Sequence, residues 1–366
     1  MDKPIRIISM PVDSGGCGWY RVRQPLDHVK RLTPHDTHVV DLADDNMNEV
    51  SQALRVADVV IVRQGGEEGM RDIKKIPEFK HLKWVLDIDD NIDAISPYSQ
   101  HYKEYGTEEF SHNGIPVWQD GQQDFNLEAN RARVASLKFG MQEADLVTVT
   151  TKRLQKYASQ YNDNVEIVPN YVDGSKWWKL PLKPNQPLRV GWSGGVSHYE
   201  DWYEIKEPLN QLMREYQFKL ISIGAHFAGI IDEDNKHLVE VWPWVPFEAH
   251  SYRMMCMNLD IAVIPLANLP FNHYKSSIKL YEFSAMGVPS VVSNVPPYSD
   301  DISDGHNCAS FKTPQEFYNK LKWLLENQEV RESIGGNALK WVRDLHEAKV
   351  VTPQIARVYE RLARRT

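Results

Sequence analysis

The chain has 366 residues, a net charge of −8 and ordinary shares of hydrophobic (42%), aromatic (10%) and charged (25%) residues. This length predicts two globular domains, the acidic balance weighs against a nucleic-acid-coating protein, and no apolar run could span a bilayer. The three cysteines form neither a metal-binding spacing nor an even disulfide set, so we expect a reducing, cytoplasmic environment.

Apolar segments alternate with helical stretches through the first half. The segment Met1-Asp2-Lys3-Pro4 leads at once into the first of them, so we expect no signal peptide. The predicted strands are residues 5–10, 38–42, 59–63, 84–88, 146–150 and 165–169. Several carry Val and Ile on both faces, as buried parallel strands do, and the alternation predicts a parallel sheet covered by helices.

A polar, turn-rich connector, residues 169–174 and 183–187, separates this half from a second series of strands. The second series comprises residues 188–192, 218–223, 238–241, 261–266, 290–293 and 308–311. We therefore predict an α/β fold of two doubly wound, Rossmann-like domains, 1–170 and 171–350.

Two glycine-rich loops follow the first strand of each half. Gly15 and Gly16 lie in the first loop, and Ser193, Gly194 and Gly195 lie in the second. Glycines at this position let the backbone approach a ligand closely, and the helix that follows offers free N–H groups. Neither loop fits the dinucleotide or P-loop pattern, but together they indicate a cleft with one loop from each domain.

The most informative segment is 272–289, which carries Lys275, Ser276, Ser277, Lys279 and Glu282 in one short stretch. Its apolar positions recur at helical spacing, and a Gly-x-Pro turn and an apolar strand follow. A loop entering a helix N-terminus favours an anion, so we predict a diphosphate site there. Glu282, one turn further in, could accept hydrogen bonds from ribose hydroxyls. The alternative is a capped amphipathic helix with solvated lysines.

These features together resemble glycosyltransferases of the GT-B fold, most closely the large retaining family-4-type sugar transferases of bacteria and phages. The likeness covers roughly 165–297 well and the first half less well. It implies that residues 351–366 form a C-terminal helix that crosses back to the first domain. It also implies that the first domain faces the acceptor.

The resemblance implies roles for individual residues. Glu282 matches the glutamate that holds the ribose of a nucleotide-diphosphate sugar, and Val245, beside Trp244, lies where the family holds the nucleobase. The residues that match diphosphate loops are Ser276, Ser277, Ile278, Ser193, Gly194 and Gly195, with Gly15 and Gly16 as their first-domain counterparts. Arg21, after the first loop, could neutralise the donor phosphate or an acidic acceptor, or form a surface salt bridge.

The sequence departs from this family at two places. Tyr274 stands where the family commonly has another glutamate that touches the donor sugar. The family's Arg and Lys after the second glycine loop are also absent. His198 lies in that region instead, and Lys275 and Lys279 could supply the positive charge, so we expect these three residues to be catalytic.

Asp89, in the Asp87-Ile88-Asp89-Asp90 turn, is the predicted acceptor-side residue, aligning or deprotonating the nucleophile. A helix cap and a divalent metal site are the alternatives, and a metal would suit a GT-A enzyme. The aromatic stretch 98–118 that follows reads as a long insertion, whose aromatics either stack on a ligand or anchor the loop.

We predict a glycosyltransferase, hexosyl or pentosyl, that is retaining, needs no metal or other cofactor and has a nucleotide-sugar donor and a carbohydrate acceptor. One alternative is a phage-type enzyme that glycosylates a hydroxylated DNA base. The other is a sugar-nucleotide-binding protein without turnover. The sequence leaves the oligomeric state open.

Overall fold

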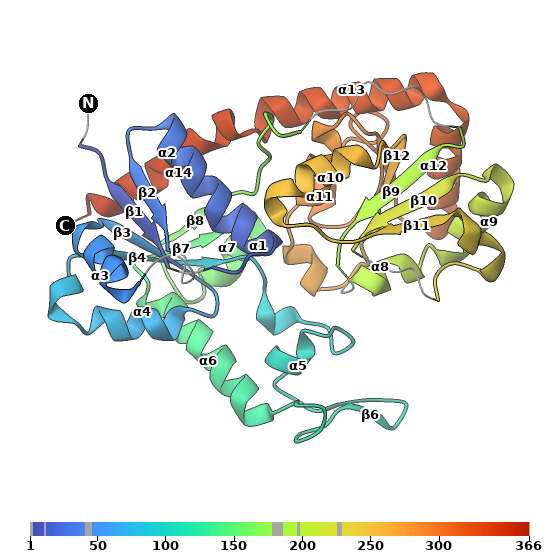
Figure 1. Cartoon of the computed structure of the whole chain (residues 1–366). Coiled ribbons are helices and arrows are strands. Elements are labelled where there is room, and N and C mark those ends of the chain that lie inside the picture. The colour runs from blue at the N-terminus through green and yellow to red at the C-terminus, as the bar shows by residue number, and fades with distance from the viewer. Residues whose placement is uncertain are drawn as a thin grey trace. The chain divides into compact units, whose positions relative to one another are not determined.

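Figure 1 shows a computed structural model of the chain, which describes residues 3–10, 12–40, 46–177, 186–195, 198–224 and 229–365. Parts of three predicted segments lie outside the described residues: 1–2, 41–42 of the second strand and 183–185 of the connector. The chain forms two compact units, Met1–Pro169 with Val351–Thr366, and Asn170–Val350.

The first unit is built on a six-stranded parallel sheet of order β2-β1-β3-β4-β7-β8. Its strands are β1 (Arg6–Ser9), β2 (Asp36–Val39), β3 (Val59–Arg63), β4 (Lys83–Ile88), β7 (Leu146–Val149) and β8 (Val165–Ile167). All six predicted strands are present, with ends shifted by a few residues. In β3 and β4 nearly every side chain is buried, because helices cover both faces of a doubly wound sheet.

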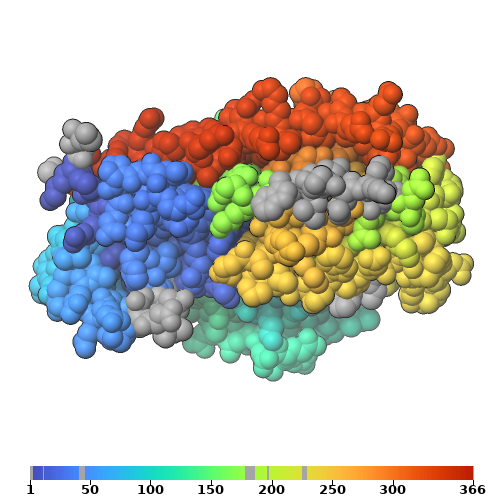
Figure 2. All heavy atoms as spheres, turned by 45° about the horizontal axis from the view of Figure 1, so that its top comes forward, coloured from blue at the N-terminus to red at the C-terminus, as the bar shows by residue number. Residues whose placement is uncertain are grey.

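The helices of this unit are α1 (Gly16–Gly18), α2 (Gln24–Leu32), α3 (Met47–Val56), α4 (Glu67–Lys74), α5 (Tyr102–Tyr105), α6 (Leu127–Glu143) and α7 (Lys152–Ala158). The C-terminal helix α14 (Ala348–Ala363) also packs here, against the residues coloured blue in Figures 1 and 2. Glu360 contacts His35 at 2.8 Å, and Arg361 contacts Glu166 at 2.7 Å. None of the described helices is both long and apolar enough to cross a membrane.

The insertion after the aspartate-rich turn is ordered around a small aromatic cluster. It contains α5 and an antiparallel hairpin, β5 (Phe110–His112) and β6 (Ile115–Trp118), which the sequence did not predict. Trp118 is buried, packs 5.8 Å from Phe125 and donates its indole N–H to the Pro97 carbonyl at 2.6 Å. Trp118 therefore anchors the loop, as one of the two interpretations expects.

The second unit repeats the architecture, with a parallel sheet of order β11-β10-β9-β12-β13-β14. Its strands are β9 (Arg189–Ser193), β10 (Lys219–Ile223), β11 (Val239–Trp242), β12 (Ile261–Ile264), β13 (Ser290–Ser293) and β14 (Ala309–Phe311), and its helices are α8 (Tyr199–Tyr203), α9 (Lys206–Tyr216), α10 (His250–Cys256), α11 (Ile278–Ala285), α12 (Pro314–Glu326) and α13 (Gln328–Leu345). Alternate strand residues feed two cores, one on each face: Leu220 and Val263 enter one, and Ile221 and Ile264 enter the other.

A buried ion pair ties the first unit together. Arg21 donates from Nε and Nη2 to both carboxylate oxygens of Asp87, at 3.0 and 2.7 Å, and from Nη1 to the Val168 carbonyl at 2.6 Å. Thr148 also donates to Asp87, at 2.7 Å. The Arg21 side chain is 1% exposed, which differs from both expectations for it: the guanidinium has no surface for a phosphate and forms no surface salt bridge.

We expect Asp87→Ala to lower the free energy of unfolding by about 3–5 kcal/mol, because it leaves the Arg21 charge buried and unpaired. The matched control is Asp344→Ala, which removes an exposed pair with Lys340 on α13 and should change stability by at most about 1 kcal/mol. Urea titration of both variants measures the difference. Equal losses of unfolding free energy in the two variants would show that burial of the Arg21–Asp87 pair does not determine its contribution to stability.

Candidate functional site

Most predicted donor-binding residues gather at the C-terminal edge of the second sheet. β9 ends at Ser193, and Gly194 and Gly195 follow directly. β12, its neighbour in the sheet, leads through residues 265–277 to α11. The strand order reverses between β9 and β12, and open parallel sheets bind ligands at the carboxyl ends of strands at such a reversal.

The glycine loop and the first turn of α11 are in contact. A Cβ on Gly194 would lie 3.1 Å from Cε of Lys279 and 2.4 Å from the buried ring of Trp192. The absence of a side chain at Gly194 therefore makes room for the lysine. Nζ of Lys279 donates a hydrogen bond of 3.0 Å to Nε2 of His198, so residues of two sequence-distant loops meet around one ammonium group.

His198 is held in one orientation by Asp201. Its Nδ1 lies 2.6 Å from Oδ2 of Asp201, whose Oδ1 accepts from the Ala267 N–H at 2.8 Å and from Asn272 at 3.1 Å. Burial and the charges of Lys279 and Lys275 lower the pKa of His198 to about 3, although Asp201 opposes the shift. The imidazole is therefore neutral at pH 7, and the lysines supply the positive charge.

The segment before α11 is fixed by hydroxyl contacts. Oγ of Ser276 accepts from the amide of Asn170 at 2.8 Å, and Ser277, the N-cap, donates to Oδ2 of Asp301 at 2.5 Å. Tyr281 donates to the same Asp301 oxygen at 3.0 Å. Ser277 thus anchors the helix start, while Ile278 and its neighbours present the N–H groups that a helix N-terminus leaves unpaired.

Glu282 lies one turn inside α11, and its side chain is 6% exposed. Its Oε1 lies 3.3 Å from Nε2 of His250, the first residue of α10. Val245, the predicted nucleobase position, is half-buried in the segment after β11, and its neighbour Trp244 is 46% exposed. The sequence did not identify His250, since its spacing from Glu282 carries no pattern.

The first glycine loop is organised by Asp13. Oδ1 of Asp13 accepts from the N–H groups of Gly15 and Gly18 at 2.9 and 3.2 Å, and Gly16 opens α1. A Cβ on Gly18 would lie 1.9 Å from the Asp13 carbonyl oxygen, so only glycine fits there. The predicted loop is therefore a tight, capped helix start.

Arg63, at the end of β3, joins this loop to the predicted catalytic Asp89. Its guanidinium donates to Asp13 at 2.8 Å and to Asp89 at 2.7 Å. Burial would raise the pKa of Asp89, but Arg63, a hydrogen bond from Cys17 and Arg21 outweigh it and hold that pKa below its usual range. Within the residues that the structure describes, no group of three or more His, Cys, Asp or Glu could hold a metal ion.

A hollow of about 420 Å³ opens at the ends of β1 and β3, where the strand order of the first sheet reverses. Its lining includes Asp13, Arg63, Gln64, Gly65 and Gly66. Nε of Arg63 and Oε1 of Gln64 are buried and have no hydrogen-bond partner among the described residues. Because both atoms are buried, the hollow does not present them to a ligand.

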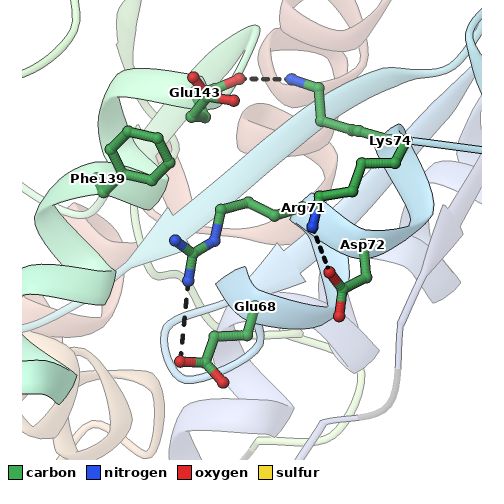
Figure 3. A pocket seen from close by; sticks show the side chains of 7 residues that line it. Glu68, Arg71, Asp72, Lys74, Phe139 and Glu143 are labelled. Carbon is green, nitrogen blue, oxygen red and sulfur yellow. Dashed lines mark hydrogen bonds and ion pairs between the residues drawn. The ribbon is translucent and has the colours of Figure 1, made fainter.

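A second hollow in the first unit, of about 730 Å³, lies between α4 and α6 (Figure 3). Most of its charged side chains have partners: Arg71 lies 3.8 Å from Glu68, Lys75 lies 2.8 Å from Asp72, and Lys74 donates to the Glu143 carbonyl. None of the predicted site residues lines it. Size therefore does not identify the site here.

Sequence reasoning missed Arg63, Asp13, Asp201 and His250. Arg63 is the last residue of a predicted strand, and Asp13 and Asp201 flank the two glycine loops. These positions lie at the sheet edge where ligands bind, so position along the strand was the signal that could have found three of the four.

Two successive doubly wound parallel sheets, each with a glycine loop at its strand-order reversal, and a C-terminal helix that packs on the first define the GT-B fold. The predicted fold class is confirmed. The three cysteines are free thiols, as the sequence predicted.

Solved structures share this fold over nearly the whole chain, although no protein-family model and no curated protein matches the sequence. A sucrose-phosphate synthase from Thermosynechococcus elongatus matches with a TM-score of 0.66 and 13% identity, over 98% of this chain and 99% of that one. HepE of Anabaena, solved with UDP-glucose, matches with a TM-score of 0.66 and 13% identity, over 98% and 100%. A glycosyltransferase from Rickettsia africae matches with a TM-score of 0.62 and 9% identity, over 100% of both chains.

The low pKa of His198 predicts how stability changes with pH. Because the folded pKa lies below the unfolded value, the contribution of His198 is fully present above about pH 6.5 and is lost as the pH falls towards 3. We expect the free energy of unfolding of His198→Gln to fall by about 2 kcal/mol less than that of the parent between pH 7 and pH 5.

Urea unfolding at the two pH values measures this difference. His237→Gln, at an exposed position of the same unit, is the control and should keep the parental pH dependence. Identical pH profiles for His198→Gln and the parent would mean that His198 is not held neutral in the folded protein.

Proposed function

We propose that the chain is a glycosyltransferase that moves a sugar from a nucleotide-diphosphate donor to a hydroxyl group of an acceptor. The observation that carries the proposal is the convergence of Lys279, Gly194 and the α11 N-terminus at the β9/β12 reversal, with Glu282 one turn away. Cations and free N–H groups suit a diphosphate, and a buried carboxylate suits vicinal hydroxyls.

The chemical task of such a site is to stabilise negative charge as it develops on the leaving diphosphate. Lys279 is positioned for this by the neutral His198, which accepts its hydrogen bond and adds no competing charge. Lys275, whose ammonium lies 5.2 Å from the Phe271 ring centroid, adds a second cation. The helix N-terminus contributes partial positive charge. His198 is thus a positioning residue for Lys279.

The similar structures support a nucleotide-sugar donor. HepE of Anabaena was solved with UDP, with UDP-glucose and with UDP and glucose, and it has the same fold. We propose that two lysines and a helix N-terminus neutralise the diphosphate without a metal ion. Resemblance to the retaining family-4-type transferases supports retention of the anomeric configuration, with transfer of a hexose or pentose in the cytoplasm.

For the acceptor we propose a carbohydrate that binds at the 420 Å³ hollow of the first unit. The polar side chains of Asp13, Arg63 and Gln64 in its lining suit the mixed donors and acceptors of sugar hydroxyls. Asp13 and Asp89 together outweigh the single positive charge of Arg63, and the excess negative charge favours a neutral ligand over a phosphate backbone. Asp89, held ionised, would accept a hydrogen bond from the incoming hydroxyl.

One observation favours a second candidate, a sugar-nucleotide-binding protein without turnover. Tyr274 stands where the resembling family has a glutamate that touches the donor sugar, so a group used in transfer is replaced. Donor binding without nucleotide release, for every acceptor tried, would support this candidate over the enzyme.

We expect one class among UDP-, GDP-, ADP- and dTDP-sugars to stabilise the protein in a thermal-shift screen, equally with and without EDTA.

Lys279→Met should lower nucleotide release by about 10²–10³-fold while the fold is retained, because it removes a charge that stabilises the leaving group. Lys340→Met, which removes an exposed lysine of α13, is the matched control.

In the same assay, sugars and duplex DNA carrying a hydroxymethylated base serve as alternative acceptors, and NMR of the product shows its anomeric configuration. Loss of activity on chelation would contradict metal independence. Transfer to DNA alone would contradict the carbohydrate acceptor, and the absence of any thermal shift would contradict the donor site.

Gly194→Ala is expected to weaken binding of the stabilising nucleotide about tenfold, because its Cβ would collide with Trp192 and Lys279 and overpacking costs about 1–3 kcal/mol. Isothermal titration calorimetry measures the affinity. Gly336→Ala is the control, since its Cβ would meet no described atom within 4 Å. Unchanged affinity in Gly194→Ala would place the ligand away from this loop.

A further inference from the structure

We propose that Asp201 is a positioning residue that fixes the tautomer of His198, and that this tautomer lets His198 hold the ammonium group of Lys279 beside the second glycine loop. The proposal rests on the proposed function, because Lys279 is the cation proposed to stabilise the leaving diphosphate. It adds a residue that acts on the ligand through two successive contacts, and it names the ring nitrogen that carries the proton.

The imidazole of His198 lies between a group that only accepts hydrogen bonds and a group that only donates them. Its Nδ1 lies 2.6 Å from Oδ2 of Asp201, and its Nε2 lies 3.0 Å from Nζ of Lys279. An ionised carboxylate has no proton to donate, and an ammonium group has no lone pair. A neutral ring with its proton on Nδ1 satisfies both contacts, so the two neighbours require the same tautomer.

Asp201 sets this tautomer, because contacts that do not involve Lys279 hold its carboxylate in place. Its Oδ1 accepts from the Ala267 N–H at 2.8 Å and from Nδ2 of Asn272 at 3.1 Å. The same Asn272 nitrogen donates to the Ala267 carbonyl at 3.0 Å, which fixes the direction of that amide. The side chains of His198 and Asp201 are 13% and 4% exposed, so protein groups rather than bulk water satisfy these atoms.

These contacts predict what the isosteric substitution Asp201→Asn does. The amide oxygen takes the place of Oδ1, because the reverse orientation would turn its NH₂ group against the N–H donors of Ala267 and Asn272. The NH₂ group then faces Nδ1 of His198 and donates to it. The ring proton moves to Nε2, where it points at the ammonium group of Lys279. The hydrogen bond between ring and lysine is therefore lost, while the shape of the site is kept.

The direct test is NMR of the His198 ring nitrogens at pH 7, in the full chain labelled with ¹⁵N-histidine and without nucleotide. Long-range proton–nitrogen correlations distinguish a protonated ring nitrogen from a bare one, and the spectrum of His198→Gln identifies the signals. We expect the proton on Nδ1 in the parent and on Nε2 in Asp201→Asn. Lys279→Met should keep the parental tautomer, because the carboxylate and not the ammonium group sets it.

Isothermal titration calorimetry with UDP, GDP, ADP and dTDP measures the consequence for the ligand. We expect Asp201→Asn to bind the parent's preferred nucleotide about tenfold more weakly, because Lys279 loses the contact that orients it. In a His198→Phe background, which has no ring nitrogen, adding Asp201→Asn should cost little further affinity. Asp234→Asn makes the same replacement at an exposed position of this unit and should change neither the tautomer nor the affinity.

A parental proton on Nε2, or its move to Nε2 in Lys279→Met, would overturn the proposal even if Asp201→Asn did not fold. A reversed tautomer in Asp201→Asn with unchanged nucleotide affinity would also overturn it, while leaving the proposed function intact. An equal loss of affinity in the His198→Phe background would mean that Asp201 acts only through the loop after β12, which contradicts the proposal. A parent that binds none of the four nucleotides would overturn both the proposed function and this role of Asp201.

Discussion

In a parallel sheet every strand ends at the same edge, and the candidate site of this protein depends on that constraint. The end of β9, at Ser193, lies beside the loop after β12 because the two strands are neighbours in the sheet. In the sequence these segments are far apart, since the stretch from Leu188 to Glu282 covers much of the second unit. Asp201 then fastens the two loops to each other by accepting from Ala267 and Asn272 while holding His198. The backbone topology thus creates the meeting point, and one buried carboxylate holds it in place.

The corresponding edges of the two sheets differ in the charges that their side chains carry. In the second unit, the ammonium of Lys279 meets a neutral imidazole, and the charge of Lys275 also acts on that imidazole, so the edge carries two cations. In the first unit, Arg63 lies between Asp13 and Asp89, so two carboxylates surround one guanidinium and leave an excess of negative charge. The same fold therefore presents two lysines at this edge in one unit and an excess of carboxylates in the other.

Contacts between buried polar side chains hold segments together in both units. Arg21 and Asp87 connect the segment after the first glycine loop to β4 and to the end of β8, beneath the buried Tyr359 of α14. Burial and the Asp87 carboxylate raise the pKa of Tyr359 well above its ordinary value, which keeps the phenol neutral beside the pair. His250 and Glu282 form a similar contact in the second unit, with aromatic rings in place of strands around them. A charged side chain placed at a buried position that lacks such a contact would have no partner for its charge.

The sequence by itself determined the order of the secondary structure, because a buried parallel strand is a local pattern of Val and Ile and a glycine loop is a local composition. All twelve predicted strands and the helix after Ser277 are present for that reason. The tertiary structure decided which polar side chains contact one another. Arg21 and Arg63 have the same chemistry, yet one is sealed against Asp87 and the other borders a hollow, and nothing in their neighbouring residues distinguishes them. Local pattern reflects burial and backbone conformation, whereas the contact between Lys279 and His198 or between Glu282 and His250 exists only once distant segments have packed.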